Sequence, residues 1–276
     1  MVNTPFAGAG CAKAPAPVEC GGGRAADHRP RRVPSPKGEA VAKIKTLLLS
    51  GANNHDWKRS SPFLRDVLEA SGKFAVTMTE NPSATLEDGA ALQGYQLLFS
   101  DYNGPAWSEA AKANFVAAVA GGTGLVILHA ADNAFPGWVE YEKMVALLWR
   151  QGTGHGQYHE FEVKIADKQH PITRGLEDFR LWDELYHKLV HMHNAPYRVL
   201  ATAYSAPETG GTGRDEPMMT VQQYGKGRVY HHVMGHVWPG DGAQHKGCSM
   251  MTFENPMFQK SLLRGCEWAA TGDVAD

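Results

Sequence analysis

The sequence predicts an α/β protein with a parallel, doubly wound sheet, and three observations support that prediction. Short apolar runs alternate with amphipathic segments between residues 44 and 149, which is typical of strands joined by helical crossovers. The apolar run 125–128 lies between glycines and His129, as expected of a central strand covered on both faces. Polar residues follow three of the runs, at His55, Asp101 and His129, so these side chains should face one crevice beyond the sheet.

Each helix expected in this half has a start or an end signal. Ser61 precedes Pro62 and should cap a helix that Gly72 ends, and Ser108 should cap a helix that ends at Gly121. Right-handed crossovers of this kind place helices on both faces of a sheet. The expected strands cover residues 44–51, 74–79, 96–100 and 125–128, and the expected helices cover residues 61–72, 86–92, 108–121 and 138–149.

The pattern changes after residue 150 and predicts added antiparallel or mixed strands. Alternation of apolar and polar residues is the main signal, and residues 224–228 form a glycine-rich hairpin turn. Asn255 with Pro256 should start a last helix that ends near Gly272. The expected strands of this half cover residues 161–165, 180–192, 199–204, 218–224 and 228–235.

Composition and charge exclude several functional classes. The 276 residues are 43% hydrophobic with a formal net charge of -2, which allows a large core and gives no basic excess for nucleic acid. No apolar stretch approaches the roughly 20 residues that span a bilayer, so no membrane partner is expected. Four cysteines without a CxxC pair indicate a reducing compartment, which we take to be the cytoplasm. Residues 1–40 are expected to be a disordered tail on a single domain of residues 41–276.

The chain contains 13 histidines, and several stand where metal or proton chemistry could occur. His129 ends a central strand, and His236 follows Gly235 at the end of a later one. His155 and His159 have the spacing that lets two imidazoles share zinc on a helix, but the neighbouring glycines argue against a helix. A strand would hold them about 13 Å apart. They share an ion only if the loop curls; otherwise His159 alone lies at the mouth of the crevice.

Two carboxylates precede a tyrosine in the segment Asp183-Glu184-Leu185-Tyr186. Glu184 is either a general acid/base at the start of a strand or part of a solvated strand end. Motifs of other chemistries are missing from the sequence. There is no GxSxG nucleophile elbow, and no GxGxxG or Walker A motif follows the first strand, so no nucleotide cofactor is expected.

Motifs along residues 44–272 resemble the trehalose-utilisation, or ThuA-like, family and keep their order. The resemblance implies a flavodoxin-like fold similar to class I glutamine amidotransferases, with antiparallel strands added in the second half. In that fold a cysteine nucleophile stands where His129 stands here, and a histidine lies near His236. The resemblance thus implies that these two histidines approach each other and that the protein is not a glutamine amidotransferase. The motifs are Ser100-Asp101-Tyr102-Asn103-Gly104-Pro105, Gly124-Leu125-Val126-Ile127-Leu128-His129-Ala130, His170-Pro171-Ile172-Thr173-Arg174-Gly175-Leu176, Asp183-Glu184-Leu185-Tyr186 and Gly225-Lys226-Gly227-Arg228-Val229.

The resemblance also implies a role in bacterial catabolism of trehalose and related disaccharides or their 3-keto derivatives. Removing the acidic C–H beside a keto group needs a base and an electrophile for the oxyanion, and a zinc-like or manganese-like divalent ion is a suitable electrophile. Isomerisation, elimination and hydrolysis are all open outcomes. The expected catalytic residues are His129, Glu184, His236 and Asp101, and the expected metal ligands are His129, His159 and His236. The expected substrate-binding residues are His55, Trp57, Asn103, Tyr186 and Arg214.

An alternative is a non-catalytic carbohydrate-binding or regulatory module on an amidotransferase-like scaffold. In that case Trp57, Trp107, Trp138 and Tyr102 would stack on sugar rings. Arg214 follows a glycine-rich stretch that is either a substrate loop or a solvated turn. The expected partner in both cases is a small-molecule carbohydrate, and a homo-oligomer is compatible with the sequence.

Overall fold

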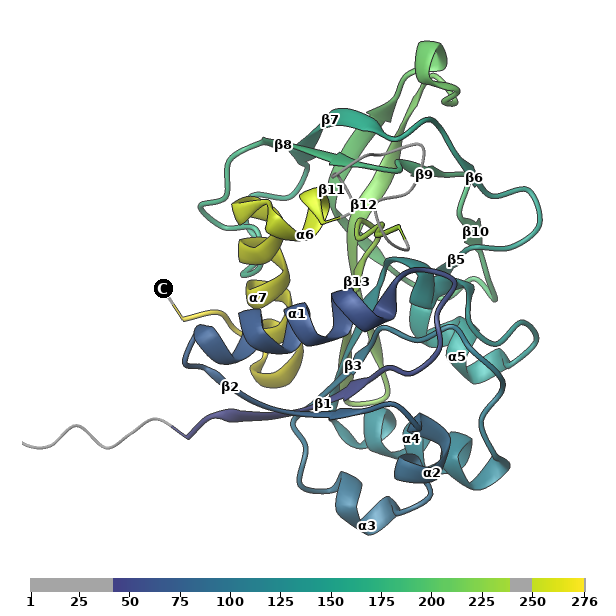
Figure 1. Cartoon of the computed structure of the whole chain (residues 1–276), viewed down its shortest axis with the longest axis vertical. Helices are drawn as coiled ribbons and strands as arrows, with labels where there is room; N and C mark the ends of the chain where they lie inside the picture. Colours follow the sequence, from purple (N-terminus) through teal and green to yellow (C-terminus); the bar gives the residue numbers. More distant parts are fainter. Residues whose placement is uncertain (1–41, 239–249, 276) are drawn as a thin grey trace, which may run out of the picture. The chain divides into compact units, whose positions relative to one another are not determined.

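One large sheet organises this computed structural model and confirms the predicted fold class. Within the described residues, 42–238 and 250–275, nine strands pair in the order β2-β1-β3-β4-β13-β12-β11-β7-β8 (Figure 1). The first five run parallel, and the later neighbours are antiparallel. The strands are β1 (Ile44–Leu49), β2 (Phe74–Thr79), β3 (Leu97–Ser100), β4 (Gly124–Leu128), β7 (His159–Ile165), β8 (Phe179–Asp183), β11 (Arg198–Ser205), β12 (Arg214–Tyr224) and β13 (Gly227–His232).

The parallel half contains strands that are covered on both faces. Every residue of β3 and β4 is buried, and a strand of that kind must be covered on both faces. The order β2-β1-β3-β4-β13 is the flavodoxin-like order. The chain therefore leaves β1, β3, β4 and β13 at the same edge of the sheet.

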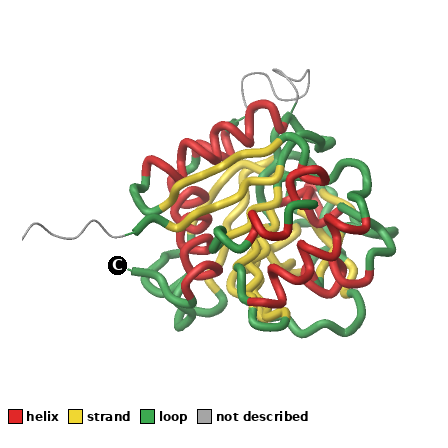
Figure 2. Tube along the Cα trace, turned by 90° about the horizontal axis from the view of Figure 1, so that it is seen from below, coloured by secondary structure: helices red, strands yellow, loops and turns green. Residues whose placement is uncertain are grey.

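Helices cover both faces of this sheet, as Figure 2 shows. Leu64 and Leu262 belong to α1 and α7 and pack in one core, while Phe115 and Tyr141 of α4 and α5 pack in the other. The predicted helix starts at Ser108 and Asn255 are confirmed, since both side chains accept backbone N–H bonds as N-caps. The helices are α1 (Trp57–Ala70), α2 (Pro82–Leu86), α3 (Gly89–Leu92), α4 (Glu109–Gly121), α5 (Val139–Val145), α6 (Met251–Glu254) and α7 (Pro256–Thr271).

Two short sheets and two 3-10 turns complete the described part of the chain. Strand β5 (Leu147–Leu148) pairs with β10 (Val190–His191), and β6 (Gly154–His155) pairs with β9 (Tyr186–His187). The turns are η1 (His129–Asn133) and η2 (Pro207–Thr209). The β6–β9 pair brings residues 154–155 beside the chain that leaves β8, which matters for the site below.

The predicted start of the first helix at Ser61 is wrong, because α1 begins at Trp57 and contains Pro62. The hydroxyls of Ser60 and Ser61 donate to the buried Asp101 carboxylate at 2.8 and 2.7 Å. These tertiary hydrogen bonds stabilise the additional first turn of α1. They do so although Pro62 lacks a backbone N–H and removes one hydrogen bond from the helix.

Three other predicted boundaries are also wrong. Residues 180–192 form β8, β9 and β10 rather than one strand, and Lys188 between the last two adopts a φ of 56° that no strand continues through. The helix expected over 138–149 stops at Val145, because Ala146 has a φ of 64°. The helix expected over 86–92 is divided into α2 and α3, and the Asp88 side chain caps the second of them.

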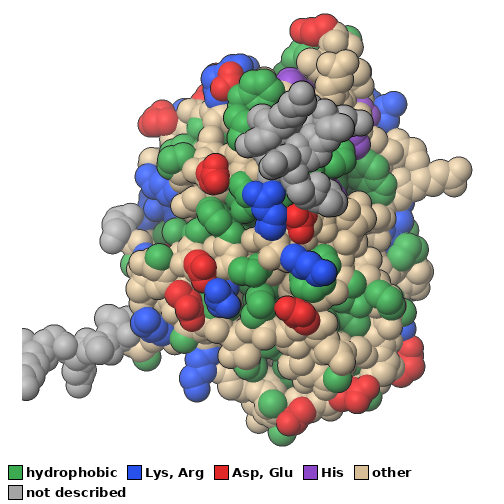
Figure 3. All heavy atoms as spheres, in the orientation of Figure 1, with side chains coloured by type: hydrophobic (Ala, Val, Ile, Leu, Met, Phe, Trp, Pro, Cys, Tyr) green, Lys and Arg blue, Asp and Glu red, His purple; other side chains and the backbone are tan. Residues whose placement is uncertain are grey.

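The expected disordered tail, residues 1–40, lies outside the described residues. Among the described helices, none combines the length and apolar character needed to cross a membrane. On the face seen in Figure 3, acidic and basic side chains are interspersed with hydrophobic and uncharged ones.

Candidate functional site

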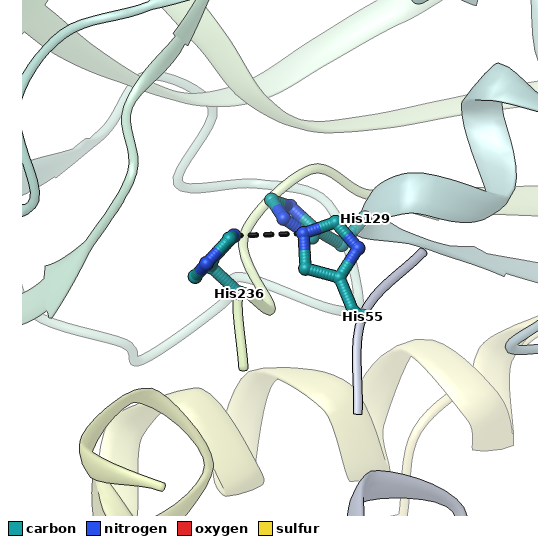
Figure 4. Close-up of side chains that lie close together, drawn as sticks. All are labelled: His55, His129 and His236. Atoms are coloured by element: carbon teal, nitrogen blue, oxygen red, sulfur yellow. Dashed lines mark hydrogen bonds between the residues drawn. The ribbon is translucent and has the colours of Figure 1, made fainter. Parts of the chain in front are cut away.

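Three buried histidines meet at the carboxyl edge of the parallel strands. His55 comes from the loop after β1, His129 from the end of β4 and His236 from the segment after β13, and their rings point toward one another (Figure 4). The ring centroid of His55 lies 4.8 Å from that of His129 and 4.4 Å from that of His236. One ligand nitrogen from each residue can be chosen so that all three lie within 4.8 Å of one another. The three side chains are therefore of a type and closeness that could hold a metal ion.

His129 occupies a strained elbow at the end of β4. Its φ of 43° lies in the left-handed region that few non-glycine residues adopt. Its Nδ1 lies 2.6 Å from the carbonyl oxygen of Val233, so Nδ1 carries the proton and donates it. The buried Nε2 then keeps its lone pair and has no hydrogen-bond partner among the described residues. Strand β13 thus orients the ring so that a bare nitrogen faces the cluster.

His55 is oriented in the same way by the loop that contains it. Its Nδ1 lies 3.2 Å from Oδ1 of Asn53, which can only accept, and its Nε2 lies 2.7 Å from Nδ1 of His236. Burial, and then the charge of His236, lowers the pKa of His55 to about 3. Burial likewise lowers the pKa of His129 well below its usual value. Both imidazoles are therefore neutral near pH 7, which is the form that binds metals.

A pocket with a volume of 430 Å³ opens beside the cluster. Glu184 forms part of its wall, with Oε2 3.0 Å from Nδ1 of His236 and 3.4 Å from Nε2 of His155. The Tyr186 ring stacks on that of His129 at 4.2 Å. The described lining residues are Asn54, His55, Ala130, Asn133, Trp149, His155, Glu184, Tyr186, His236, Val237 and Trp238. Such a mixture of aromatic and polar side chains suits a small polar ligand with apolar faces.

Two buried aspartates support the pocket from behind. The Asp183 carboxylate accepts backbone N–H bonds from Glu184, Gly235 and His236 at 2.8, 2.7 and 3.1 Å, which ties the end of β8 to the segment carrying His236. Burial raises the pKa of Asp183 to about 8, against these hydrogen bonds. Asp101 accepts from Ser60, Ser61 and Asn53, and burial raises its pKa to about 6. The structure thus places Asp101 behind His55 rather than on the pocket wall.

Four other residues named from the sequence are not among the described residues that line the pocket. His159 starts β7, and its Nδ1 lies 2.6 Å from the carbonyl oxygen of Gln157, so His55 takes the place expected for His159 in the cluster. Trp57 is the first residue of α1, and Arg214 is an exposed residue at the start of β12. Asn103 joins loops by donating to the carbonyl oxygen of Ala130 at 3.1 Å.

The aromatic residues of the pocket differ from those named for sugar stacking. Tyr102, Trp107 and Trp138 pack against Phe135 inside the domain. The described pocket is lined by Trp149, Trp238 and Tyr186 instead. Trp149 follows β5 and Trp238 follows β13. Neither tryptophan belongs to a sequence motif or a regular spacing that would predict a place in the pocket. Only their closeness in sequence to His155 and His236 could have drawn attention to them.

The whole domain matches a protein-family model. The model is described as trehalose utilisation, ThuA, and it matches residues 45–269. The chain belongs to this family. A solved structure of a ThuA-like protein from Parabacteroides merdae is 36% identical, with a TM-score of 0.75 over 85% of this chain and 92% of that one.

Two further solved structures share the fold of this ThuA-family chain. A ThuA-like protein from Bacteroides uniformis is 17% identical, with a TM-score of 0.65, over 87% of this chain and 96% of that one. A cytoplasmic protein from Salmonella typhimurium is 14% identical, with a TM-score of 0.56, over 82% of this chain and 99% of that one. No curated protein matches the sequence. The predicted family and its amidotransferase-like fold are thus confirmed.

A second buried pair lies beneath the elbow of the ThuA-family site. Asp132 of η1 and His231 of β13 are 0% and 1% exposed, and Oδ2 lies 3.5 Å from Nε2. None of the side-chain polar atoms of the two residues has a hydrogen-bond partner among the described residues. The main-chain oxygen of Asp132 accepts from the Arg150 guanidinium, which also bonds the buried Glu142 carboxylate. The pair therefore links the turn that contains His129 to the neighbouring strand.

Replacing Gly235 by alanine is expected to disturb the cluster directly. The residue has a φ of 146°, and an added Cβ would lie 3.0 Å from Cβ of His129 and 3.2 Å from Cδ1 of Leu128. We expect the free energy of unfolding to fall by about 1–3 kcal/mol because of backbone strain and crowding. Chemical denaturation measures this loss. Gly137→Ala is the control, because its φ is 86° and no atom lies within 4 Å of the added Cβ. Equal losses in the two variants would show that crowding against His129 adds nothing.

Proposed function

We propose that this ThuA-family protein is a metal-assisted enzyme of bacterial disaccharide catabolism. The observation that supports this most strongly is the meeting of three buried imidazoles, those of His55, His129 and His236, with ligand nitrogens within 4.8 Å. The family description, trehalose utilisation, supplies the substrate class. The proposed substrates are trehalose-like disaccharides or their 3-keto derivatives.

The donor set fits a divalent ion of the zinc or manganese type. Metal-binding histidines usually donate their second ring N–H to a carbonyl or carboxylate oxygen, which fixes the tautomer. Here the side-chain oxygen of Asn53 accepts from Nδ1 of His55, and the carbonyl oxygen of Val233 accepts from Nδ1 of His129. An imidazole-rich site favours zinc over calcium or magnesium. We assign His55, His129 and His236 as the ligands.

The proposed chemistry starts with removal of the C–H proton beside the keto group of the sugar. A bound ion would stabilise the negative charge that develops on the sugar oxygen. Glu184 is the proposed base, because its carboxylate is 5% exposed and faces the pocket with Oε2 3.0 Å from His236. The indole of Trp149 and the ring of Tyr186 would cover the apolar face of the sugar. The protein itself thus supplies the base, the orientation of the sugar and partial exclusion of water.

A turnover assay with 3-keto-trehalose and with trehalose tests this proposal. We expect consumption of at least one of the two sugars, detected by chromatography. Removal of metal with a chelator should abolish it, and zinc or manganese should restore it. Turnover that survives complete metal removal would refute the metal-assisted mechanism. Sugar binding without turnover in the metal-loaded protein would instead favour the carbohydrate-binding module.

The remaining parts of the proposal concern cellular context. The scarcity of cysteine supports a reducing, cytoplasmic location. The formal net charge of -2 supports a small-molecule partner rather than nucleic acid.

A further inference from the structure

His155 lies at the mouth of the pocket and has no role in the chemistry described so far. It belongs to β6, and its side chain is 38% exposed, whereas that of Glu184 is 5% exposed. Its ring lies 6.0 Å from the Trp149 indole and 6.3 Å from the Tyr186 ring, measured between centroids. The residue therefore touches both the bulk solvent and the space proposed for the sugar.

Hydrogen bonding fixes which ring nitrogen of His155 can exchange a proton. Nδ1 lies 2.7 Å from the carbonyl oxygen of Gly156, which can only accept, so Nδ1 carries a proton. Nε2 faces Oε2 of Glu184 at 3.4 Å. A neutral His155 would thus point a lone pair at the carboxylate, while a protonated one points an N–H at it. The Glu184 carboxylate can therefore accept a hydrogen bond from His155 only when Nε2 carries a proton.

The other titratable residues of the described pocket lining are poor proton donors. His55 and His236 belong to the proposed metal centre, and Glu184 is the proposed base. Burial raises the pKa of Tyr186 well above 10, so its hydroxyl gives up a proton reluctantly. His155 is the remaining titratable side chain of the described lining, and its 38% exposure lets it exchange protons with solvent.

We infer that His155 is the general acid that protonates the departing sugar oxygen in an elimination reaction of 3-keto glycosides. This inference rests on the proposed function. Glu184 takes the proton from the carbon beside the keto group, and the electron pair forms a carbon–carbon double bond to the anomeric carbon. The bond from the anomeric carbon to the glycosidic oxygen breaks. That oxygen takes the proton from Nε2 of His155. Solvent then returns a proton to His155 and accepts the one held by Glu184, so both groups regain their starting forms and no oxidant or reductant is consumed.

The charges around His155 are compatible with this role. Glu184 faces it from the segment between β8 and β9, and His187 of β9 lies beside Gly154, the residue before it. His55 and His236 line the same pocket. We expect kcat/KM for the disaccharide to fall at alkaline pH, because the acid must be protonated to act.

The test compares two leaving groups in three proteins: the unsubstituted chain, His155→Gln and His159→Gln. His159 is a matched control, because it lies four residues away and outside the described pocket lining. With 3-keto-trehalose, whose leaving sugar needs a proton, His155→Gln should lower kcat by about 10²–10⁴-fold. With 4-nitrophenyl 3-keto-α-glucoside, whose leaving group departs as an anion, kcat should change less than about 5-fold. Bound zinc should stay the same in all three proteins.

The outcomes separate this inference from the proposed function. If His155→Gln slows both substrates equally, or matches His159→Gln on both, His155 is not the general acid even though the enzyme is active. Retention of the alkaline fall of kcat/KM in His155→Gln would also overturn the inference. If the unsubstituted protein turns over neither substrate and not trehalose either, the proposed function fails and the inference fails with it. Turnover of trehalose alone would overturn the inference and leave the proposed function in place.

Discussion

Replacing His129 by alanine is expected to lower turnover of 3-keto-trehalose by about 10²–10³-fold, the size of effect seen when a group that stabilises a developing oxyanion is removed. In the cluster, the ring of His129 is the one whose tautomer is fixed by a main-chain carbonyl, that of Val233. This leaves Nε2 of His129 as the nitrogen that can bind an ion. Its loss leaves two imidazoles, which should also weaken the binding of zinc. Steady-state kinetics and zinc titration of the same preparation measure both effects.

The control for His129→Ala is His191→Ala, a histidine of β10 whose Nε2 bonds the carbonyl oxygen of Ala195. It should keep its turnover and its zinc. Residue 129 has a left-handed φ of 43°. The backbone there can relax more easily when the packed imidazole is replaced by the small alanine side chain, so His129→Ala should fold. An active, zinc-binding His129→Ala would show that the elbow histidine does not belong to the site.

Replacing Asp132 by alanine is expected to lower the free energy of unfolding by about 3–5 kcal/mol. The Asp132 and His231 side chains are both buried, and Oδ2 lies 3.5 Å from Nε2. Removing one partner leaves the other polar group buried without its partner. Urea denaturation monitored by tryptophan fluorescence measures the loss.

A double variant distinguishes loss of a partner from loss of packing. Asp132→Leu with His231→Leu removes both polar groups, and replacing a buried pair by apolar residues is often neutral or stabilising. We therefore expect the double variant to recover most of the stability lost in Asp132→Ala. A double variant as unstable as the single one would mean that the space beneath the elbow, rather than the pairing, determines stability.

The position of the site could be predicted from the sequence because parallel strands impose it. Once residues 44–49 and 124–128 are buried strands of one parallel sheet, His55 and His129 must leave the same edge. His236 follows from the same reasoning after β13. The meeting of His129 with His236 at 5.6 Å between ring centroids agrees with the approach that the family resemblance implied.

The third member of the cluster could not be chosen from spacing. The i, i+4 pair His155 and His159 suggested His159 as a ligand, whereas the third member is His55. Residues 154–155 form β6 and pair with β9, which places His155 and not His159 beside Glu184. Loop curvature of that kind depends on a contact with residues more than 30 positions away. The early start of α1 has the same origin, since Ser60 and Ser61 bond to Asp101 about 40 residues later.

The most direct test of the proposed metal centre is native mass spectrometry of the full chain after incubation with zinc and removal of the excess. We predict one ion bound to each chain, and none retained by a His55→Ala, His129→Ala, His236→Ala triple variant that still folds by circular dichroism. Equal zinc retention by the triple variant, or no retention by the unsubstituted chain with either zinc or manganese, would contradict a metal site at these three histidines.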